Sequence, residues 1–479
     1  MFKKGVAHKK PSTCYAASVL IIVLAIVLGA NYRFDAPIQP MFLIAWLFVY
    51  PACMSLGYTL KEIDDGVMES CKKGFGAVLI MMAVGAIIST WIAAGTVPAI
   101  IYYGLQIISP KVFLLTTFVL CSMVSLACGT SWGTMGTAGI AMYAVGASLG
   151  IPAPLTVGAI VSGSYLGDMV SPMSDSTNVV AAAVGVDLIT HCKQLAYIAA
   201  PVSVITAALY YIIGLRFSVD TFDNSYIIEV SSAIAAQFNL GFAVFLPMIF
   251  LLILLMSNKP AMLSMIASAL LGCFIAVLYQ NLPSTEAIQV FWTGFKISTG
   301  NTFIDTLLNR GGVQSMFAPA CLMFYAFGMI GAFNTVGILD AIVEPIVRRV
   351  RTVIQLTAAS QFISIIGNML GTNTFSLLMT GTLMSPVYAK HGLHPTNLSK
   401  AINATSTVFC PLIPWNASGI YVVALFGIST ASFAPYAFYS YIMPIAAFLF
   451  VVFGLKVIPA GVNFDRTDDG CAEIKTESE

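Results

Sequence analysis

A series of apolar runs recurs along almost the whole sequence, and it constrains the fold more than any other feature. Runs of about 17 to 25 apolar residues have the length that a helix needs to cross a bilayer. With 58% hydrophobic and only 9% charged residues, the chain has too little polar surface to cover a soluble globule of 479 residues. Candidate spans, some of them shorter than this length, lie near Cys14–Ala30, Ile38–Gly57, Gly76–Ile108, Val112–Cys128, Thr134–Leu149, Leu195–Leu215, Phe242–Met256, Met262–Gln280, Phe317–Leu339, Val353–Leu370 and Phe433–Val457. We therefore predict an all-α polytopic membrane protein.

The positions of the basic residues predict how the chain lies in the membrane. No small-x-small cleavage pattern follows the first apolar run, so a first spanning helix is favoured over a cleaved signal peptide. By the positive-inside rule, basic segments stay in the cytoplasm. The basic residues concerned are Lys3, Lys4, Lys9, Lys10, Lys72, Lys73, Arg348, Arg349 and Arg351. We predict a multi-pass protein of the inner (plasma) membrane with a cytoplasmic N-terminus, and lipid as its surroundings.

The two halves of the sequence resemble each other at a fixed offset of 242 residues. Twelve of the 48 positions from 129 to 176 are identical at that offset, and half of them are Gly, Pro or Ser. The identical pairs include Gly129 with Gly371, Thr130 with Thr372, Ser164 with Ser406, Pro172 with Pro414 and Ser176 with Ser418. Apolar composition alone produces some matches, so coincidence stays the alternative. An internal repeat with matching interrupted segments is typical of ion-coupled carriers, which predicts two inverted repeats with broken helices and re-entrant segments.

The repeat and the polar connections together suggest the domain organisation. We expect a cytoplasmic tail at 1–13, a first transmembrane repeat half at 14–216, a connecting loop at 217–241, a second half at 242–458 and a disordered cytoplasmic tail at 459–479. Two polar connections, Lys61–Lys73 and Ser284–Gln314, interrupt the apolar runs. The second of them carries amphipathic stretches around 290–295 and 303–308 that we expect along the membrane surface.

The segment Gly167–Asn178, G-D-M-V-S-P-M-S-D-S-T-N, concentrates polar groups between apolar flanks. An ionisable group inside the bilayer is costly unless it faces a cavity, a partner or an ion, which makes Asp168 and Asp175 candidates for function. Pro172 prevents a continuous helix. Carboxylate, hydroxyl and carbonyl oxygens are the ligands that a hard monovalent or divalent cation prefers. The alternative is a short loop outside the membrane. The candidate ligands here are Asp168, Ser171, Asp175, Ser176, Thr177 and Asn178, with Asp168 and Asp175 as the residues that bind the cation directly.

The internal repeat relates three further polar segments to the aspartate segment. Gly129–Thr137, G-T-S-W-G-T-M-G-T, places Thr130 and Ser131 along a would-be helix, where close helix packing is the other interpretation. Its counterpart, Gly371–Gly381, carries Asn373 and Thr374, and the counterpart of the aspartate segment, Phe409–Gly419, carries Asn416. The second half thus offers neutral ligands where the first offers carboxylates.

These segments resemble the NhaC family of sodium/proton antiporters over most of the membrane part. The resemblance is carried by T-W-I-A-A-G-T-V-P-A-I-I-Y-Y-G-L from Thr90, the Gly129 and Gly167 motifs, and P-L-I-P-W-N from Pro411. It implies discontinuous helices that meet near the membrane midplane and a carrier that exchanges Na⁺ for H⁺, with Asp168 and Asp175 as the residues that bind Na⁺. Relatives of this kind include sodium-coupled exchangers of malate and lactate.

One departure from the family pattern affects the choice of substrate. Family members usually have an acidic G-D-Q-Y-type motif in the second half, where this chain has G-T-N-T-F from Gly371 to Phe375. The missing carboxylate favours the alternative function, a sodium-coupled exchanger of a small organic anion or amino acid. Our principal prediction is Na⁺/H⁺ antiport by alternating access, in which the two ions compete for one carboxylate.

Other classes of protein fit the sequence less well. Channel filters usually repeat around a multimeric ring, whereas this chain has two unlike half-sites. The histidines neighbour no candidate nucleophile, and no phosphate-binding loop is present, so we expect neither an enzyme nor an ATP-driven pump. The ten cysteines lie scattered with no C-x-x-C, as helix-packing residues do. We expect no cofactor and no nucleic acid partner, since 22 basic and 21 acidic residues nearly balance, and a homodimer stays open.

Overall fold

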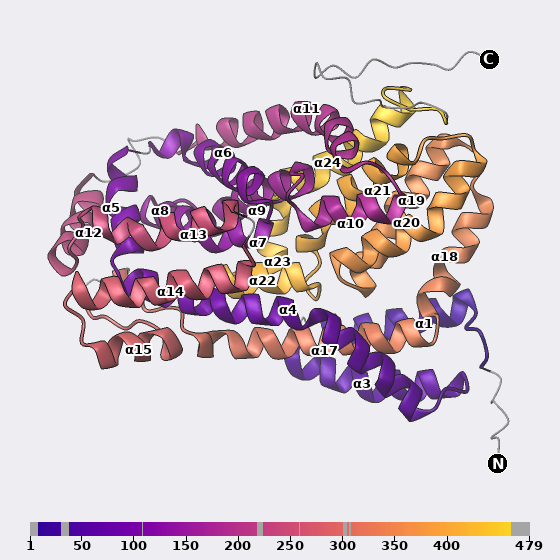
Figure 1. Cartoon of the computed structure of the whole chain (residues 1–479), viewed down its shortest axis with the longest axis horizontal. Coiled ribbons are helices and arrows are strands. Elements are labelled where there is room, and N and C mark those ends of the chain that lie inside the picture. The colour runs from indigo at the N-terminus through magenta and orange to yellow at the C-terminus, as the bar shows by residue number, and fades with distance from the viewer. Residues whose placement is uncertain are drawn as a thin grey trace.

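A computed structural model describes residues 8–29, 38–107, 109–217, 224–257, 259–299, 304–305 and 308–460. Helices α1 to α11 form the first half (Figure 1). Their bounds are α1 (Thr13–Leu24), α3 (Ile38–Ser55), α4 (Leu60–Ala93), α5 (Thr96–Ile107), α6 (Pro110–Cys128), α7 (Ser131–Thr134), α8 (Ile140–Ser148), α9 (Ala153–Val170), α10 (Asp175–Val184) and α11 (Leu188–Gly214). A short π-helical stretch, Met135–Gly139, joins α7 to α8.

The remaining helices follow α11 along the chain, and short 3₁₀ turns lie between several of them. They are α12 (Asn224–Gln237), α13 (Leu246–Met256), α14 (Ala261–Leu278), α15 (Ser284–Thr293), α17 (Phe317–Thr335), α18 (Ile338–Arg349), α19 (Val353–Leu370), α20 (Asn373–Lys390), α21 (Pro395–Phe409), α22 (Ala417–Phe426), α23 (Thr430–Phe433) and α24 (Phe438–Val452). Within the described ranges the only extended pairing is one isolated antiparallel bridge between Leu393 and Pro459. The predicted all-α class is confirmed.

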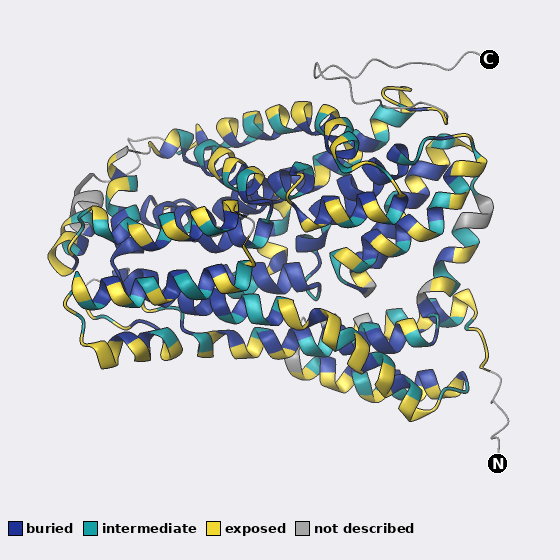
Figure 2. Cartoon of the chain, in the orientation of Figure 1, coloured by how far each residue is buried: buried dark blue, intermediate teal, exposed yellow. Residues whose placement is uncertain are grey.

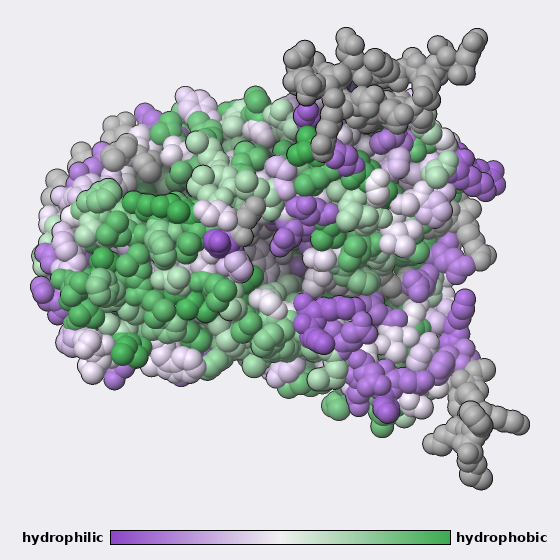
Figure 3. Space-filling view, in the orientation of Figure 1, coloured by the Kyte–Doolittle hydropathy of each residue, from purple (hydrophilic) through white to green (hydrophobic). Residues whose placement is uncertain are grey.

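The lengths and the hydropathy of these helices fit a membrane. Among the described residues, five segments are long and apolar enough to cross a bilayer: Leu60–Ala93, Pro110–Cys128, Leu188–Gly214, Ala261–Leu278 and Val313–Thr335. Three bent pairs raise the number of candidate spans to eight, and one of them joins Pro395–Leu412 to Ala417–Phe426 at 44°. Large apolar side chains such as Leu270 and Phe274 on α14 are more than half exposed, and a broad hydrophobic area covers α13 and α14 in Figure 3. Such a surface suits lipid contact, as in a multi-pass membrane protein.

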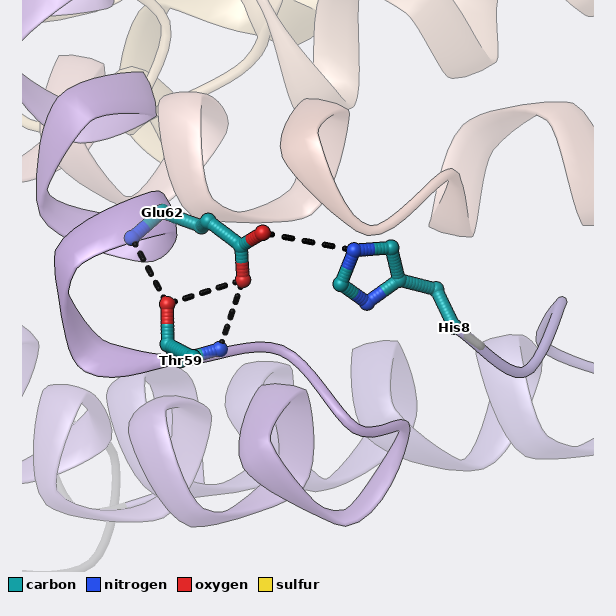
Figure 4. A network of polar contacts seen from close by, with 3 residues as sticks. All are labelled: His8, Thr59 and Glu62. Carbon is teal, nitrogen blue, oxygen red and sulfur yellow. Dashed lines mark hydrogen bonds and ion pairs between the residues drawn. The ribbon is translucent and has the colours of Figure 1, made fainter. Parts of the chain in front are cut away.

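Helix α4 differs from the expectation that Lys61–Lys73 forms a polar connection. The whole segment is the first part of α4, which begins with a capping box between Thr59 and Glu62 (Figure 4). The Thr59 backbone N–H donates to Glu62 Oε2 at 2.8 Å, and His8 Nε2 lies 3.3 Å from Glu62 Oε1. Lys73 pairs with Glu69 one turn earlier at 2.7 Å. Because the cap satisfies the first free N–H groups, a hydrophilic start continues directly into the apolar helix.

Helices α9 and α21 form the centre of the molecule. Figure 1 shows α9, α10 and α21 between α11 on one side and α4 on the other, and Figure 2 shows dark, buried segments there. Every residue of α21 from Thr396 to Val408 is buried, although the segment from Asn397 to Thr407 contains six Ser, Thr or Asn side chains. Buried polar side chains need hydrogen-bond partners inside the protein. A helix that buries them on all faces therefore points to a polar centre.

Two segments that were predicted as connections contain helices in the structure. The segment predicted as a loop at 217–241 contains α12, and the surface segment predicted from Ser284 contains α15. The predicted tails and the stretch at 303–308 fall partly outside the described residues, which leave out 1–7, 301–303, 306–307 and 461–479.

Candidate ion-binding site

The aspartate segment is a break between two helices, as its proline predicts. Helix α9 ends at Val170, the chain is extended at Ser171, and α10 begins at Asp175 after the N-cap Ser174. The side chain of Ser174 accepts a hydrogen bond from the Ser176 backbone N–H at 3.1 Å. Thr177 Oγ1 lies 2.7 Å from the carbonyl oxygen of Ser171 and 2.8 Å from that of Ser174. Hydroxyl side chains thus satisfy the backbone groups that the interrupted helix leaves without partners.

Asp168 lies in the last turn of α9 and is the acceptor at the centre of a ring of hydroxyls. Ser131 Oγ donates to Asp168 Oδ2 at 2.6 Å, and Ser174 Oγ donates to Oδ1. Ser176 Oγ lies 3.3 Å from Oδ1 and 3.1 Å from the Asp168 carbonyl oxygen. Hydrogen bonds to an ionised carboxylate are the stronger kind and favour the charged form. Because each hydroxyl also carries lone pairs and can rotate, the same oxygens can turn toward a cation bound at the carboxylate.

Close packing at two glycines positions Ser131, one of the hydrogen-bond partners of Asp168. At Gly167 an added Cβ would lie 2.4 Å from the Leu126 backbone N, so α9 packs directly on the backbone of α6. Gly129 ends α6 with φ of 66°, a left-handed conformation that favours glycine, and a Cβ there would lie 2.6 Å from the Met173 carbonyl carbon. Thr130 then caps α7 by accepting from the Gly133 N–H at 3.3 Å, and Ser131 begins the helix. The two breaks of the first half therefore meet at Asp168.

The second half has an analogous break without a carboxylate. Asn416 caps α22 by accepting from the Ser418 N–H at 3.0 Å, as Ser174 caps α10. Its amide donates to the carbonyl oxygens of Asn368 at 2.9 Å and Gly371 at 3.0 Å. The residue 242 positions after Asp168 is Cys410, whose Sγ lies 3.3 Å from Ser418 Oγ.

A cluster of amides and hydroxyls fills the space beside this second break. Ser406 Oγ lies 2.8 Å from Asn373 Oδ1 and 2.9 Å from Ser376 Oγ, and the amide of Asn368 donates to it at 3.0 Å. Asn373 Nδ2 lies 3.3 Å from Thr407 Oγ1. Asn368 Oδ1 is buried and has no hydrogen-bond partner. The sequence placed Asn373 and Asn416 in the second half-site, but it gave no signal for Asn368.

Contacts between the two halves join the breaks. Asn403 on α21 donates to the Met169 carbonyl oxygen at 3.1 Å, next to Asp168, and lies 3.0 Å from His191 Nε2 on α11. Thr407 Oγ1 donates to Asn403 Oδ1 at 2.7 Å, which continues the chain of hydrogen bonds to Asn373. Tyr421 stacks on Trp132 with ring centroids 4.3 Å apart and donates to the Trp132 carbonyl oxygen at 2.8 Å. His191, Asn403 and Ser174 were not among the predicted site residues.

The remaining predicted site residues lie around this centre at different depths. Ser171 Oγ donates to the Leu126 carbonyl oxygen at 2.9 Å, which anchors the break to α6. Asp175 and Asn178 are exposed on α10, and Asn178 donates to the Pro172 carbonyl oxygen at 3.0 Å. Thr374 is exposed at the start of α20. No hydrogen bond joins Asp175 to the Asp168 cluster among the described residues, which also contain no group of three His, Cys, Asp or Glu side chains that could hold a metal ion.

Comparison with known proteins identifies the family. The model of the Na⁺/H⁺ antiporter family matches residues 5–183 and 163–455. A malate-2H(+)/Na(+)-lactate antiporter of Bacillus subtilis (strain 168) is 35% identical over 441 residues, which cover 92% of each chain. The Na(+)/H(+) antiporter NhaC of Alkalihalophilus pseudofirmus (strain ATCC BAA-2126 / JCM 17055 / OF4) is 31% identical over 456 residues, 94% of this chain and 97% of the relative. The arginine/ornithine antiporter ArcD of Halobacterium salinarum (strain ATCC 700922 / JCM 11081 / NRC-1) is 31% identical over 404 residues, 84% of this chain and 83% of the relative.

These matches extend over nearly the whole chain, and the relatives are transporters, not enzymes. The predicted resemblance is thereby confirmed, together with the assignment to a multi-pass plasma membrane protein. With helices that break at a polar centre containing one carboxylate, the chain belongs to the NhaC-type Na⁺/H⁺ antiporter family.

Proposed function

We propose that this antiporter works by alternating access, with Asp168 binding either Na⁺ or a proton. The observation that carries the proposal is the arrangement of Ser131, Ser174 and Ser176 around the Asp168 carboxylate. One carboxylate surrounded by neutral oxygens is a ligand set for a hard cation, and a proton on the same carboxylate removes the charge that attracts the cation. Competition for this carboxylate couples the two ions, because the site changes the side of the membrane to which it is open with either Na⁺ or a proton bound.

The proposed alternating motion uses the predicted inverted repeat. The spacing of 242 residues between the halves recurs in the helix bounds, since α9 begins at Ala153 and α21 at Pro395. Helix α10 spans Asp175–Val184, and α22 spans Ala417–Phe426 at the same spacing. Gly185 and Gly427, which follow these helices, are both left-handed, with φ of 76° and 73°. This agreement supports a repeated unit, which we place in the membrane with inverted orientation and the N-terminus in the cytoplasm.

Asp168→Asn tests the proposal, because it removes the charge and keeps the size of the side chain. The variant and the wild type are reconstituted in proteoliposomes, a Na⁺ gradient is imposed, and the internal pH is recorded with no organic solute present. We expect exchange in the wild type and none in Asp168→Asn. Asp175→Asn is the matched control, since Asp175 is exposed: it is expected to raise the KM for Na⁺ and to retain exchange. Wild-type exchange by Asp168→Asn would refute the role of this carboxylate.

A second candidate function is sodium-coupled exchange of a small carboxylate or amino acid. The second half-site offers Asn373, Asn416 and Cys410 in place of a carboxylate, so a bound organic anion would meet less repulsion there. One relative is named for malate and lactate and another for arginine and ornithine. The same vesicles, supplied with malate, lactate or amino acids, distinguish the two functions. Proton movement that occurs only with an added solute would favour the second function over simple Na⁺/H⁺ exchange.

A further inference from the structure

Tyr421 is a buried tyrosine of the second half whose hydroxyl group contacts the first half. It lies on α22, in the second turn after the cap residue Asn416, and only 1% of its surface is exposed. Its ring stacks on Trp132 of α7 with centroids 4.3 Å apart, and its hydroxyl donates to the Trp132 carbonyl oxygen at 2.8 Å. Helices α7 and α22 lie beside each other near the centre of the molecule (Figure 1). This contact has no part in the exchange proposed at Asp168.

Helix α7 has few hydrogen bonds of its own that fix its position. It is a single turn of four residues, and a π-helical stretch follows it directly. The Met135 N–H is shared between the carbonyl oxygens of Ser131 and Trp132, as is common at helix ends. A first helical turn costs more conformational entropy than its hydrogen bond returns, so such a short piece needs contacts from outside. The Tyr421 hydroxyl is a contact of this kind, directed at the backbone of α7.

The packing along α22 brings the Tyr421 hydroxyl against the chain that follows Ser131. An added Cβ at Gly136 would lie 3.1 Å from Tyr421 Oη, which is tighter than an ordinary contact. A second aromatic contact lies further along, where the rings of Phe426 on α22 and Tyr143 on α8 have centroids 5.2 Å apart. Helix α22 therefore follows the chain from α7 into α8, and Tyr421 contacts it at the end that carries Ser131.

A shift of α7 would act on Asp168 through Ser131. The carbonyl oxygen that Tyr421 binds belongs to Trp132, the residue directly after Ser131. Ser131 Oγ lies 2.6 Å from Asp168 Oδ2, and a displacement of about 0.5–1 Å weakens or breaks a hydrogen bond of this length. Stacked rings can slide against each other and stay in contact, whereas the bond from the hydroxyl to the carbonyl oxygen fixes a distance and a direction. The hydroxyl is therefore the part of Tyr421 that can hold α7 in one place.

We propose that Tyr421 is a positioning residue for the ion site. Its hydroxyl holds the Trp132 carbonyl oxygen and thereby keeps the Ser131 hydroxyl on the Asp168 carboxylate. The inference rests on the proposed function, in which the Ser131 oxygen is a ligand of Na⁺ at Asp168. Among the described residues, the one hydrogen bond of the Tyr421 side chain is the bond to Trp132, so Tyr421 acts on the carboxylate only through α7. A hydroxyl of the second half thus contributes to the sodium affinity of the first.

Tyr421→Phe tests the inference, because it removes the hydroxyl and keeps the stacked ring. The Na⁺ dependence of exchange is recorded in proteoliposomes at fixed pH. The loss of one hydrogen bond of this kind weakens an equilibrium about fivefold, so the KM for Na⁺ should rise by about that factor. The rate at saturating Na⁺ should stay close to that of the wild type, because a high Na⁺ concentration still fills the site. An unchanged KM for Na⁺ would overturn the inference.

Ser131→Ala shows whether Tyr421 acts through Ser131. If it does, the Tyr421 hydroxyl has nothing left to position once the Ser131 oxygen is gone. The double variant Ser131→Ala/Tyr421→Phe should then have the KM for Na⁺ of Ser131→Ala alone. Effects that multiply in the double variant would show two independent contributions, which contradicts the inference. Ser131→Ala with the wild-type KM for Na⁺ would contradict it as well.

Tyr210→Phe is the matched control, because Tyr210 has an equivalent hydrogen bond that does not involve α7. Tyr210 is fully buried on α11, where its hydroxyl donates to the Tyr436 carbonyl oxygen at 2.7 Å and lies 2.8 Å from Ser162 Oγ. Both variants should melt at a slightly lower temperature than the wild type in detergent, but only Tyr421→Phe should raise the KM for Na⁺. The same rise in Tyr210→Phe would show a general effect of losing a buried hydroxyl, and the inference would fail.

A second measurement does not depend on transport. Binding of radioactive Na⁺ to the protein in detergent measures the affinity of the site directly, and Tyr421→Phe should weaken it by the same factor as the KM. Wild-type affinity in Tyr421→Phe would overturn the inference while Na⁺/H⁺ exchange stands. A wild type that binds Na⁺ but moves no protons without an organic solute would instead refute the proposed function, and Na⁺ binding by the two proteins would still decide the role of Tyr421.

Discussion

Gly167→Ala tests whether the close packing of α9 on α6 positions the proposed ion site. The added Cβ would lie 2.4 Å from the Leu126 backbone N and 2.4 Å from Ser125 Cβ, whereas ordinary contacts begin at 3.4 Å. Relief of this clash requires a separation of about 1 Å, because backbone atoms cannot rotate away as a side-chain end can. The Ser131 hydroxyl, now 2.6 Å from Asp168 Oδ2, would then lie outside hydrogen-bond distance.

The expected effects on stability and on transport differ in size. Overpacking of this kind costs about 1–3 kcal/mol of unfolding free energy, which a thermal melt in detergent detects. A displacement of about 1 Å in a site lowers the rate by roughly 10²-fold, which Na⁺-driven acidification or alkalinisation of vesicles detects. Gly76→Ala is the control, since nothing lies within 4 Å of an added Cβ there. If Gly167→Ala exchanged ions with the wild-type rate and the wild-type KM for Na⁺, the packing of α9 on α6 would not be what positions Asp168.

Two further substitutions separate the site from the scaffold. Ser131→Ala removes a charge-assisted hydrogen bond worth about 1.5–3 kcal/mol and one oxygen ligand, so the KM for Na⁺ at fixed pH should rise tenfold or more, and an unchanged KM would exclude Ser131 from the site. Thr59→Ala removes the capping box of α4 and should lower the free energy of unfolding by about 1 kcal/mol, without change in the KM for Na⁺. Ser109→Ala is the matched control for this cap, because Ser109 precedes α6 without a side-chain hydrogen bond, and equal melting of the two variants would contradict the role of the cap.

The sequence predicts the parts of the site that have a local signal. A carboxylate beside a proline in an apolar region predicts a broken helix, and the structure ends α9 at Val170 after Asp168. The fixed spacing of the halves also predicts where the second break occurs. His191 and Asn403 have no such signal, because a single polar residue in a helix is compatible with many roles until its neighbours are known. Their contacts join positions 212 residues apart, which only the packing of α11 on α21 establishes.

Average hydropathy does not predict where α4 begins, and the physical reason is a different one. A charged stretch such as Lys61–Lys73 has the composition of a connecting loop, but helix formation depends on caps and on side-chain pairs one turn apart. Thr59 with Glu62 and Glu69 with Lys73 supply both at the water-exposed end of the helix. The apolar part of α4 begins only after this end, so average hydropathy identifies the span and misses where the helix begins.

The proposed coupling of Na⁺ and H⁺ at Asp168 depends on the unequal chemistry of the two helix breaks. At the same position in the two breaks stand Asp168 and Cys410, each beside a serine, Ser176 or Ser418. A second carboxylate at Cys410 would add a negative charge to the same buried region, and two like charges there would favour protonation of one of them. With a thiol, the region carries one carboxylate that a single Na⁺ can neutralise completely. In the proposed function, the neutral amides and hydroxyls of the second half line the site without competing for the cation's charge, and Asp168 is the group at which sodium and proton alternate.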